Sequence, residues 1–284
     1  MSLMNKRTII AVIVYSLVAI LALIVFVVLI AFSQRDRSVL LSAHKTYDHN
    51  QSERKYLIYS PRDEVEQIVI GLHGFGDTSR RFAYYTALHN SADSNTLVVY
   101  PEAAPGKDGT KKGWNAGYCC GSGFFGELDD SGFIIGLVEK LKQEHNAPDA
   151  KVFVTGFSNG AFMAQRLAAE HPEVIDGAAI ASGSIGTEDK SLSPKQPVPI
   201  LLMHGEKDKI VPFNGGPGSS DPDFVWLDFA QTQTTWESVN GSEATTKVIT
   251  YENDKHQWHG WRLANFWHRK TDASQEAMNF FSNL

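Results

Sequence analysis

The stretch that decides the fold is Lys151-Val-Phe-Val-Thr-Gly-Phe-Ser-Asn-Gly-Ala-Phe-Met-Ala-Gln-Arg-Leu-Ala-Ala-Glu170. Its first five residues are mostly apolar and β-branched, which favours a buried strand, whereas residues 158–170 have the pattern of a helix. Gly156 and Gly160 lie at the junction, where they allow a tight turn. A strand that runs directly into a helix is typical of a parallel sheet covered by helices.

The same alternation of strand and helix patterns continues along the chain. Apolar runs predict strands at residues 55–59, 67–72, 96–100, 151–155, 200–203 and 247–251. Helical patterns occupy residues 158–170, 226–239 and 273–281, and another begins after Asp129 or Asp130, either of which can cap it. This order predicts an α/β fold: a mostly parallel sheet with helices on both faces.

Residues 8–32 differ from the rest because they contain no charged side chain. About 20 apolar residues cross a membrane core, so this segment is predicted to be a transmembrane signal-anchor helix. A cleaved secretory signal is the alternative, with Ala31-Phe32-Ser33 resembling a cleavage site. The flanking charges are nearly balanced; we expect a single-pass chain with its N-terminus inside and the large domain extracytoplasmic.

The domain boundaries follow from this segment. We expect a tail at residues 1–7, the anchor at 8–32, a linker at 33–54 and a catalytic domain at 55–284. Lys6 and Arg7 are the basic residues before position 33, so the net charge falls from −6 to −8 without the N-terminal segment. An acidic domain does not suit a nucleic-acid partner. Two cysteines cannot complete a disulfide scaffold or a four-thiolate zinc site.

Gly156-Phe-Ser-Asn-Gly160 matches the G-x-S-x-G pattern in the required context, after a strand and at the start of a helix. Such an elbow exposes the serine hydroxyl, which indicates that Ser158 is a nucleophile. The alternative is a glycine-rich turn in which Ser158 only caps the helix.

A nucleophilic serine needs a base and an acid that orients the base, and in this architecture they follow the serine in the order acid, then histidine. Asp208 lies in the turn after a strand, beside Glu206, and is the candidate acid; it could also be a turn cap. His256 and His259 lie on the loop after the last strand, and His268 follows. The spacing favours His256 because it is nearer the strand end.

An oxyanion hole requires two backbone amides beside the serine. One is expected from Asn159, which directly follows the nucleophile. The other is expected from the glycine-rich loop after residues 67–72, with Phe75 as first choice and Gly76 as second. His73 on this loop is expected to be structural.

Several motifs together resemble the α/β-hydrolases grouped as short polyhydroxybutyrate depolymerases and feruloyl esterases, including LpqC-type bacterial esterases. The resemblance covers residues 55–284. The motifs are Leu72-His-Gly-Phe-Gly-Asp-Thr78, Tyr100-Pro-Glu102, Gly113-Trp-Asn-Ala-Gly-Tyr-Cys-Cys-Gly121, Asp129-Asp-Ser-Gly-Phe-Ile134, Val154-Thr-Gly-Phe-Ser-Asn-Gly-Ala161, His204-Gly-Glu-Lys-Asp208 with Val211-Pro212, and His256-Gln-Trp-His-Gly260. In this family the last motif usually reads His-x-Trp-x-Gly, and His259 stands where proline is common. The resemblance therefore implies a triad of Ser158, Asp208 and His256.

The resemblance leaves the substrate open. Trp114 and Trp258 are candidates for an aromatic acyl pocket, or they are packing residues. Cys119 and Cys120 form either a vicinal disulfide or a pair of buried thiols. The chain departs from many relatives at Ser242, where they have cysteine. We also expect it to lack the polymer-binding module of the large depolymerases and to have a membrane anchor. These last two features favour small or oligomeric esters over an insoluble polyester.

The sequence therefore predicts a serine esterase that forms an acyl-enzyme on feruloyl, acetyl or short hydroxyalkanoate esters, with no metal or organic cofactor. Two other functions remain open. One is a serine peptidase of the same fold, and the other is a non-catalytic binding protein that uses this fold.

Overall fold

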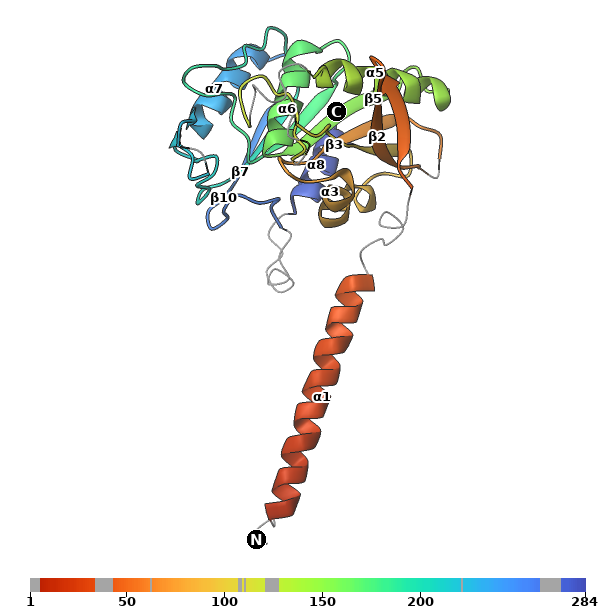
Figure 1. Ribbon diagram of the computed structural model, residues 1–284, viewed down its shortest axis with the longest axis vertical. Helices are drawn as coiled ribbons and strands as arrows, with labels where there is room; N and C mark the ends of the chain where they lie inside the picture. The colour runs from red at the N-terminus through yellow and green to blue at the C-terminus, as the bar shows by residue number, and fades with distance from the viewer. Residues whose placement is uncertain are drawn as a thin grey trace.

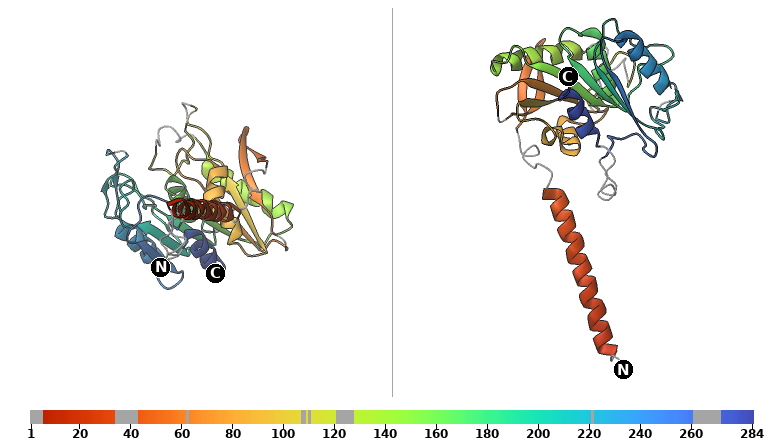
Figure 2. Two further views of the ribbon diagram at one scale, coloured as in Figure 1. Left: turned by 90° about the horizontal axis from the view of Figure 1, so that it is seen from below. Right: turned by 180° about the vertical axis from the view of Figure 1, so that it is seen from behind.

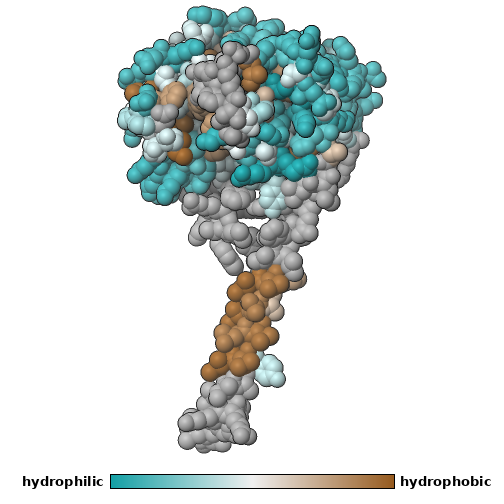
Figure 3. Space-filling view, viewed as in Figure 1, coloured by the Kyte–Doolittle hydropathy of each residue, from teal (hydrophilic) through white to brown (hydrophobic). Residues whose placement is uncertain are grey.

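The computed structural model describes residues 6–33, 43–61, 63–106, 109, 111–120, 128–220, 222–260 and 272–284. His268, the outside candidate for the base, lies beyond these residues. Helix α1 (Lys6–Ser33) covers the predicted anchor and extends as a rod below the domain (Figure 1). Its side chains are described from residue 12 to 26, and they form an apolar surface that contrasts with the hydrophilic face of the domain (Figure 3).

Within this described part of the chain, no helix combines the length and the apolar character that crossing a membrane requires. The transmembrane anchor therefore stays a prediction from the sequence.

The domain is built on a sheet of eight strands in the order β1-β2-β4-β3-β5-β6-β7-β10. All neighbouring strands from β4 to β10 run parallel, whereas β1 and β2 pair antiparallel at one edge. The strands are β1 (Lys45–His49), β2 (Ser52–Tyr59), β3 (Gln67–Leu72), β4 (Thr96–Pro101), β5 (Lys151–Phe157), β6 (Gly177–Ala181), β7 (Ile200–Gly205) and β10 (Thr246–Tyr251). The predicted mostly parallel α/β sheet is confirmed.

Helices cover both faces of this sheet, as predicted (Figure 2). On one face α5, α6 and α7 bury Phe133, Phe162 and Trp236 in a large apolar cluster. On the other face α3 and α8 bury Phe82 and Phe281 in a second cluster. The helices are α3 (Ser79–Thr86), the short 3-10 helix η1 (Leu88–Asn90), α5 (Asp130–Glu144), α6 (Asn159–Glu170), α7 (Phe229–Asn240) and α8 (Ala273–Phe281), and a two-stranded ribbon pairs β8 (Gly216–Pro217) with β9 (Val225–Trp226).

The sheet begins earlier than predicted, because residues 45–54, expected in the linker, form β1 and the start of β2. Strand β1 is an edge strand with mostly exposed residues, so it lacks the apolar run on which the prediction relied. One of its side chains, Tyr47, packs against the core beside Phe133, and their ring centroids are 6.2 Å apart.

Candidate active site

Ser158 lies at a sharp turn between β5 and α6. Its backbone has φ 54° and ψ −120°, an unfavourable conformation for a non-glycine residue. The turn also depends on close packing around it. A Cβ on Gly156 would lie 2.2 Å from the Gly160 carbonyl oxygen, and a Cβ on Gly160 would lie 2.2 Å from the Leu72 carbonyl oxygen. The two glycines of the motif are therefore required by steric contact, and the half-buried Ser158 side chain points toward His256.

The structure brings Ser158, His256 and Asp208 together although they come from three separate loops. His256 Nε2 is 2.9 Å from Ser158 Oγ, and His256 Nδ1 is 2.7 Å from Asp208 Oδ2. These residues, named here the elbow triad, have the connectivity in which an acid orients a histidine that accepts the serine proton. The order serine, acid, histidine along the chain is the one expected from the sequence.

The Asp208 carboxylate is buried but fully hydrogen-bonded. Its Oδ1 atom accepts bonds from the amides of Ile210 (2.8 Å) and Val211 (3.0 Å). Burial raises the pKa of Asp208, but the hydrogen bonds from His204 and His256 together lower it by more. The net pKa therefore lies well below the usual value for an aspartate. The carboxylate is therefore ionised at neutral pH, as an acid that stabilises a charged imidazole must be.

His204 is the contact that the sequence analysis missed. Its Nε2–H donates to the Val211 carbonyl oxygen at 2.9 Å and lies 3.4 Å from Asp208 Oδ2. The His204-Gly-Glu-Lys-Asp208 motif could have predicted this contact, because a histidine at the end of a strand can approach a carboxylate in the turn that follows the strand. Glu206, the other carboxylate in this turn, is exposed and accepts a hydrogen bond from Thr250 Oγ1 at 2.8 Å.

The glycine-rich loop after β3 lies against the elbow. A Cβ on Gly74 would be 3.6 Å from Ser158 Cβ, so the backbone before Phe75 approaches the nucleophile closely. The Gly76 amide donates to the Lys112 carbonyl oxygen at 2.7 Å, which removes it as an oxyanion donor. The amide of Asn159 belongs to the first turn of α6, where no helical carbonyl is available to accept from it. Phe75 and Asn159 therefore remain the candidate pair.

The prediction that Trp114 and Trp258 line an acyl pocket is wrong, because their exposed fractions are 0% and 3%. The Trp258 indole donates to Ser274 Oγ at 2.9 Å and meets the Phe82 ring edge-on, with ring centroids 5.4 Å apart. Both indoles are used in packing, which was the alternative reading of their sequence positions.

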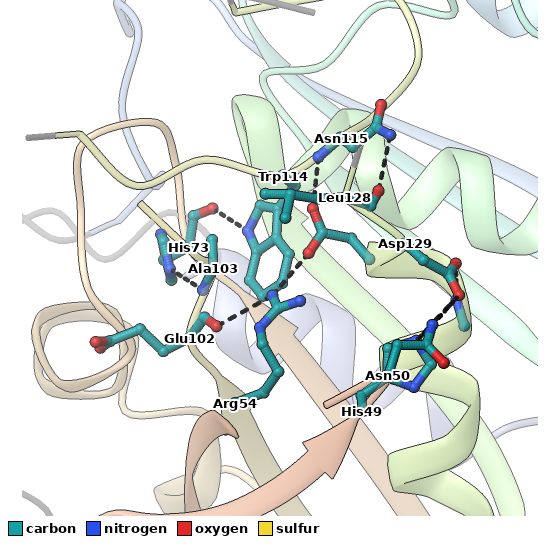
Figure 4. A network of polar contacts seen from close by, with 12 residues as sticks. His49, Asn50, Arg54, His73, Glu102, Ala103, Trp114, Asn115, Leu128 and Asp129 are labelled. Atoms are coloured by element: carbon teal, nitrogen blue, oxygen red, sulfur yellow. Dashed lines mark hydrogen bonds and ion pairs between the residues drawn. The ribbon is translucent and has the colours of Figure 1, made fainter. Parts of the chain in front are cut away.

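Trp114 instead connects the two sides of the candidate oxyanion hole. Its indole Nε1–H donates to the His73 carbonyl oxygen at 2.9 Å (Figure 4). Its backbone amide donates to Asn159 Oδ1 at 2.7 Å, and its carbonyl oxygen accepts from Asn159 Nδ2 at 3.0 Å. The residue after the nucleophile is thus fixed to the loop that carries Phe75.

His73 is buried beneath this loop, as expected for a structural residue. The Ala103 amide donates to its Nε2 at 3.1 Å, and its Nδ1–H donates to the Gly74 carbonyl oxygen at 2.8 Å. Burial lowers the pKa of His73, which favours the neutral ring that this pattern requires.

A buried ion pair supports the segment around Trp114 from the other side (Figure 4). Arg54 Nη2 is 2.7 Å from Asp130 Oδ1, and its guanidinium lies over the Phe133 ring at 4.1 Å. The second oxygen of Asp130, Oδ2, accepts a hydrogen bond from the backbone amide of Asn115 at 2.7 Å. Strand β2, helix α5 and residue 115 are therefore held as one unit.

His259, the alternative base, does not reach Ser158. Its Nδ1 is 2.9 Å from Asp254 Oδ2 and its Nε2 is 3.3 Å from Ser182 Oγ. The two histidines of one loop therefore point to different serines. Neither Ser182 nor Asp254 is among the site residues predicted from the sequence.

Among the described residues, no group of three or more His, Cys, Asp and Glu side chains is placed to hold a metal ion. Cys119 and Cys120 are joined by a disulfide, the first of the two alternatives considered for them. A polar cavity of about 610 Å³ lies along α6 and is lined by Asn115, Tyr118, Arg166 and Lys190 among others. It contains no residue of the elbow triad.

Two large apolar side chains are more than a third exposed in the described part of the domain. Phe75 is 40% exposed and Ile210 is 38% exposed. Phe75 follows the glycine that packs against Ser158, and the Ile210 amide bonds Asp208. Both residues therefore lie next to the elbow triad in the chain and are candidates for substrate contact.

These features define the α/β-hydrolase fold, with a nucleophile elbow at Ser158. Residues 131–221, which include Ser158 and Asp208, match the family described as phospholipase/carboxylesterase. The thermostable esterase of a solved crystal structure has a TM-score of 0.55 at 16% identity and covers 84% of this chain and 60% of its own. The Bacillus cereus carboxylesterase has a TM-score of 0.54 at 16% identity and covers 81% of this chain and 94% of its own.

The curated relatives that match this chain are also named as esterases or depolymerases. A putative esterase, NocK, from Nocardia uniformis subsp. tsuyamanensis is 29% identical over 54% of this chain and 43% of its own length. Feruloyl esterase B from Piromyces equi is 22% identical over 71% of this chain and 38% of its own. Poly(3-hydroxyalkanoate) depolymerase C from Paucimonas lemoignei is 34% identical over 41% of this chain and 27% of its own length. This chain spans less than half of each of these three relatives, and the predicted resemblance to α/β-hydrolase esterases is confirmed.

Proposed function

We propose that this chain is a serine carboxylic-ester hydrolase that acts through Ser158, His256 and Asp208. The observation that carries the proposal is the elbow triad itself: a serine on a strained strand–helix turn, 2.9 Å from an imidazole that lies 2.7 Å from a buried carboxylate. The esterase relatives support the choice of reaction.

The reaction has two halves. Ser158 Oγ attacks the ester carbonyl carbon while His256 Nε2 takes the hydroxyl proton, and Asp208 stabilises the imidazolium. The amides of Phe75 and Asn159 bind the negatively charged oxygen of the tetrahedral intermediate. His256 then gives the proton to the leaving alkoxide, leaving an acyl-enzyme. Water, deprotonated by His256, attacks the acyl carbon and releases the acid and Ser158.

The acyl group that best suits this site is apolar and planar or short. Phe75 and Ile210 are the exposed apolar side chains nearest in the chain to the candidate oxyanion amide and to the acid. Lys111 Nζ lies 5.6 Å from the centre of the Phe75 ring, which adds a positive charge beside that surface. Feruloyl esters are therefore our first choice of substrate, and acetyl and short hydroxyalkanoate esters are the other members of the class.

A panel of methyl ferulate, p-nitrophenyl acetate and a soluble 3-hydroxybutyrate ester tests this proposal. We expect wild-type hydrolysis of at least one ester and loss of it in Ser158→Ala. Phe75→Ala and Ile210→Ala should raise KM for methyl ferulate several-fold more than for the acetate. Equal effects on both esters would remove the apolar acyl site from the proposal, whereas full activity of Ser158→Ala would remove the mechanism.

We also propose that residues 8–32 anchor the chain to a membrane with the catalytic domain outside the cytoplasm. The uncharged 25-residue segment supports anchoring. The bond between Cys119 and Cys120 suits an oxidising compartment. The full chain should sediment with membranes and resist a carbonate wash, and protease added to intact spheroplasts should degrade the domain. Release of the chain by carbonate would contradict anchoring, and a domain protected from the protease would contradict the extracytoplasmic orientation.

A further inference from the structure

A second Ser–His–Asp set lies close to the elbow triad, formed by Ser182, His259 and Asp254 and named here the buried triad. His259 Nδ1 is 2.9 Å from Asp254 Oδ2, and His259 Nε2 is 3.3 Å from Ser182 Oγ. Burial lowers the pKa of His259, although the Asp254 contact opposes the shift, and a neutral ring suits this pattern. Its Nδ1–H then donates to Asp254 while its Nε2 accepts from the serine.

The buried triad is closed to any substrate. Ser182 and His259 both have an exposed fraction of 0%, so no ester carbonyl can approach the hydroxyl. The Tyr251 ring stacks on the imidazole with centroids 4.1 Å apart and covers one face of it. Ser182 therefore cannot act as a nucleophile, because no substrate can reach it. Its contacts with His259 instead hold segments of the chain in place.

The contacts connect the loop that carries His256 to the strand end that holds the nucleophile. His259 and Asp254 lie on either side of His256 in the sequence, on the loop after β10. Ser182 directly follows Ala181, whose carbonyl oxygen accepts from the Ser158 amide at 3.0 Å. A short chain of contacts thus runs from the base loop, through His259 and Ser182, to the backbone of Ser158.

The same serine also reaches the residue beside the base. Ser182 Oγ lies 3.4 Å from the carbonyl oxygen of Gln257, the neighbour of His256, so its single proton has two acceptors on the base loop, this oxygen and His259 Nε2. Its backbone has φ 52°, and its amide donates to the Met203 carbonyl oxygen on β7 at 2.9 Å. Ser182 is therefore fixed by β7 before it contacts the base loop.

Asp254 fixes the loop to the turn that carries the acid. Its carbonyl oxygen accepts from the Lys207 amide at 3.0 Å, one residue before Asp208. A Cβ on Gly205 would lie 2.5 Å from the same oxygen, so the two segments pack at backbone distance. The base loop is thus joined, by the Ser182–His259 contact and by the Asp254 backbone, to the strand ends that present all three members of the elbow triad.

We propose that Ser182, His259 and Asp254 are positioning residues that hold His256 at its distance from Ser158 and Asp208. The proposal rests on the proposed function. A general base must be held within about 0.5 Å of its productive position, and a base on a loop needs supporting contacts to stay there. The buried triad supplies those contacts without touching the substrate.

The test compares Ser182→Ala and His259→Phe with the wild type. Ser182→Ala removes one oxygen, and His259→Phe keeps a ring against Tyr251 while it removes both hydrogen bonds. The matched control is Ser131→Ala, because Ser131 Oγ lies 2.8 Å from His171 Nε2 in a Ser–His contact between α5 and the C-cap of α6 that does not involve the base loop. Reactive sites are counted by titration with a fluorophosphonate, so that unfolded molecules do not contribute.

We expect kcat per titrated site to fall about tenfold in each variant with KM unchanged, and the double variant to be no slower than His259→Phe. Ser131→Ala should keep the wild-type value. A merely structural role would lower the number of titrated sites and leave kcat per site unchanged, and that result would overturn the proposal. If His259→Phe does not fold, Ser182→Ala alone decides.

A second measurement keeps this proposal separate from the proposed function. The His256 Nδ1–H proton that faces Asp208 should give a low-field NMR resonance in the wild type without any substrate. We expect the resonance to broaden or shift in Ser182→Ala and to stay in place in Ser131→Ala. An unchanged resonance in Ser182→Ala would refute positioning even if no tested ester is hydrolysed.

Discussion

The elbow triad and the buried triad use the same three residue types with similar contacts, but their environments are opposite. In the elbow triad the serine is half-exposed on a strained turn and the carboxylate is buried and bonded by two amides. In the buried triad the serine is inaccessible and the Asp254 side chain is 20% exposed. Hydrogen-bond distances alone therefore do not identify a nucleophile.

The difference shows which features a reactive triad needs beyond its contacts. The serine must be reachable, the acid must stay ionised in a buried position, and amides must face the developing oxyanion. The elbow triad combines an accessible serine with a buried acid, next to Asn159 at the start of a helix. The buried triad has an inaccessible serine, so its hydrogen bonds serve to hold segments of chain together.

The largest expected difference is between the two serines. Ser158→Ala should lower kcat/KM for a responsive aryl ester by about 10⁴-fold or more, because the nucleophile is lost. Ser182→Ala should lower it about tenfold, because only positioning is lost. Steady-state kinetics on the two purified variants measures both values, and equal losses would erase the distinction between the triads.

The acids should differ nearly as much. Asp208→Asn keeps the shape of the side chain but removes the charge that orients and stabilises His256, and we expect kcat to fall about 10⁴-fold at neutral pH. Asp254→Asn should reduce kcat by about tenfold, because it weakens one contact of the base loop. A larger loss for Asp254→Asn than for Asp208→Asn would reverse the assignment of the two acids.

Trp114 sharpens the comparison through the oxyanion hole, which only the elbow triad faces. Trp114→Phe removes the indole bond to the His73 carbonyl oxygen, and the amides should lose alignment, lowering kcat roughly tenfold. Trp236→Phe is the matched control, since its buried indole bonds Gln165 Oε1 at 3.0 Å on another part of α6. It should lower thermal stability and leave kcat within about twofold. Unchanged kcat in Trp114→Phe would show that the indole bond to His73 does not align the amides of Phe75 and Asn159.

The smallest expected effect is on the pH dependence of stability. The depressed pKa of Asp208 means that its ionised form stabilises the fold above about pH 5, and that this contribution is lost as the pH falls toward the folded-state pKa. Urea unfolding at pH 7 and pH 3 should therefore show a smaller loss of unfolding free energy in Asp208→Asn than in the wild type. Asp149→Asn, at an exposed position, should match the wild-type loss.

Long apolar strands and the elbow could be predicted from the sequence because their patterns are local. Strand β6 was missed, since Gly177-Ala-Ala-Ile-Ala181 consists mainly of residues with little strand preference, and burial between β5 and β7 decides its conformation. Strand β1 was missed because an edge strand needs no apolar run. Helix α3 was missed as well; it is short and charged, and one face packs on the sheet.

The three members of the elbow triad could be predicted because chain order and spacing restrict them. The supporting residues could not, since Trp114, His204 and Ser182 act through contacts between distant segments. The tryptophans show the limit most clearly: an aromatic residue near a motif suggests a binding wall, but only packing reveals that Trp114 is fully buried.

The central claim, that Ser158 and not Ser182 is the nucleophile, is tested most directly by covalent labelling. The native full chain is treated with a fluorophosphonate, digested, and the modified peptide is identified by mass spectrometry. We predict one modification per chain, on the peptide that contains Ser158, and none in Ser158→Ala. Labelling of Ser182, or no labelling of the folded wild type, would contradict the account.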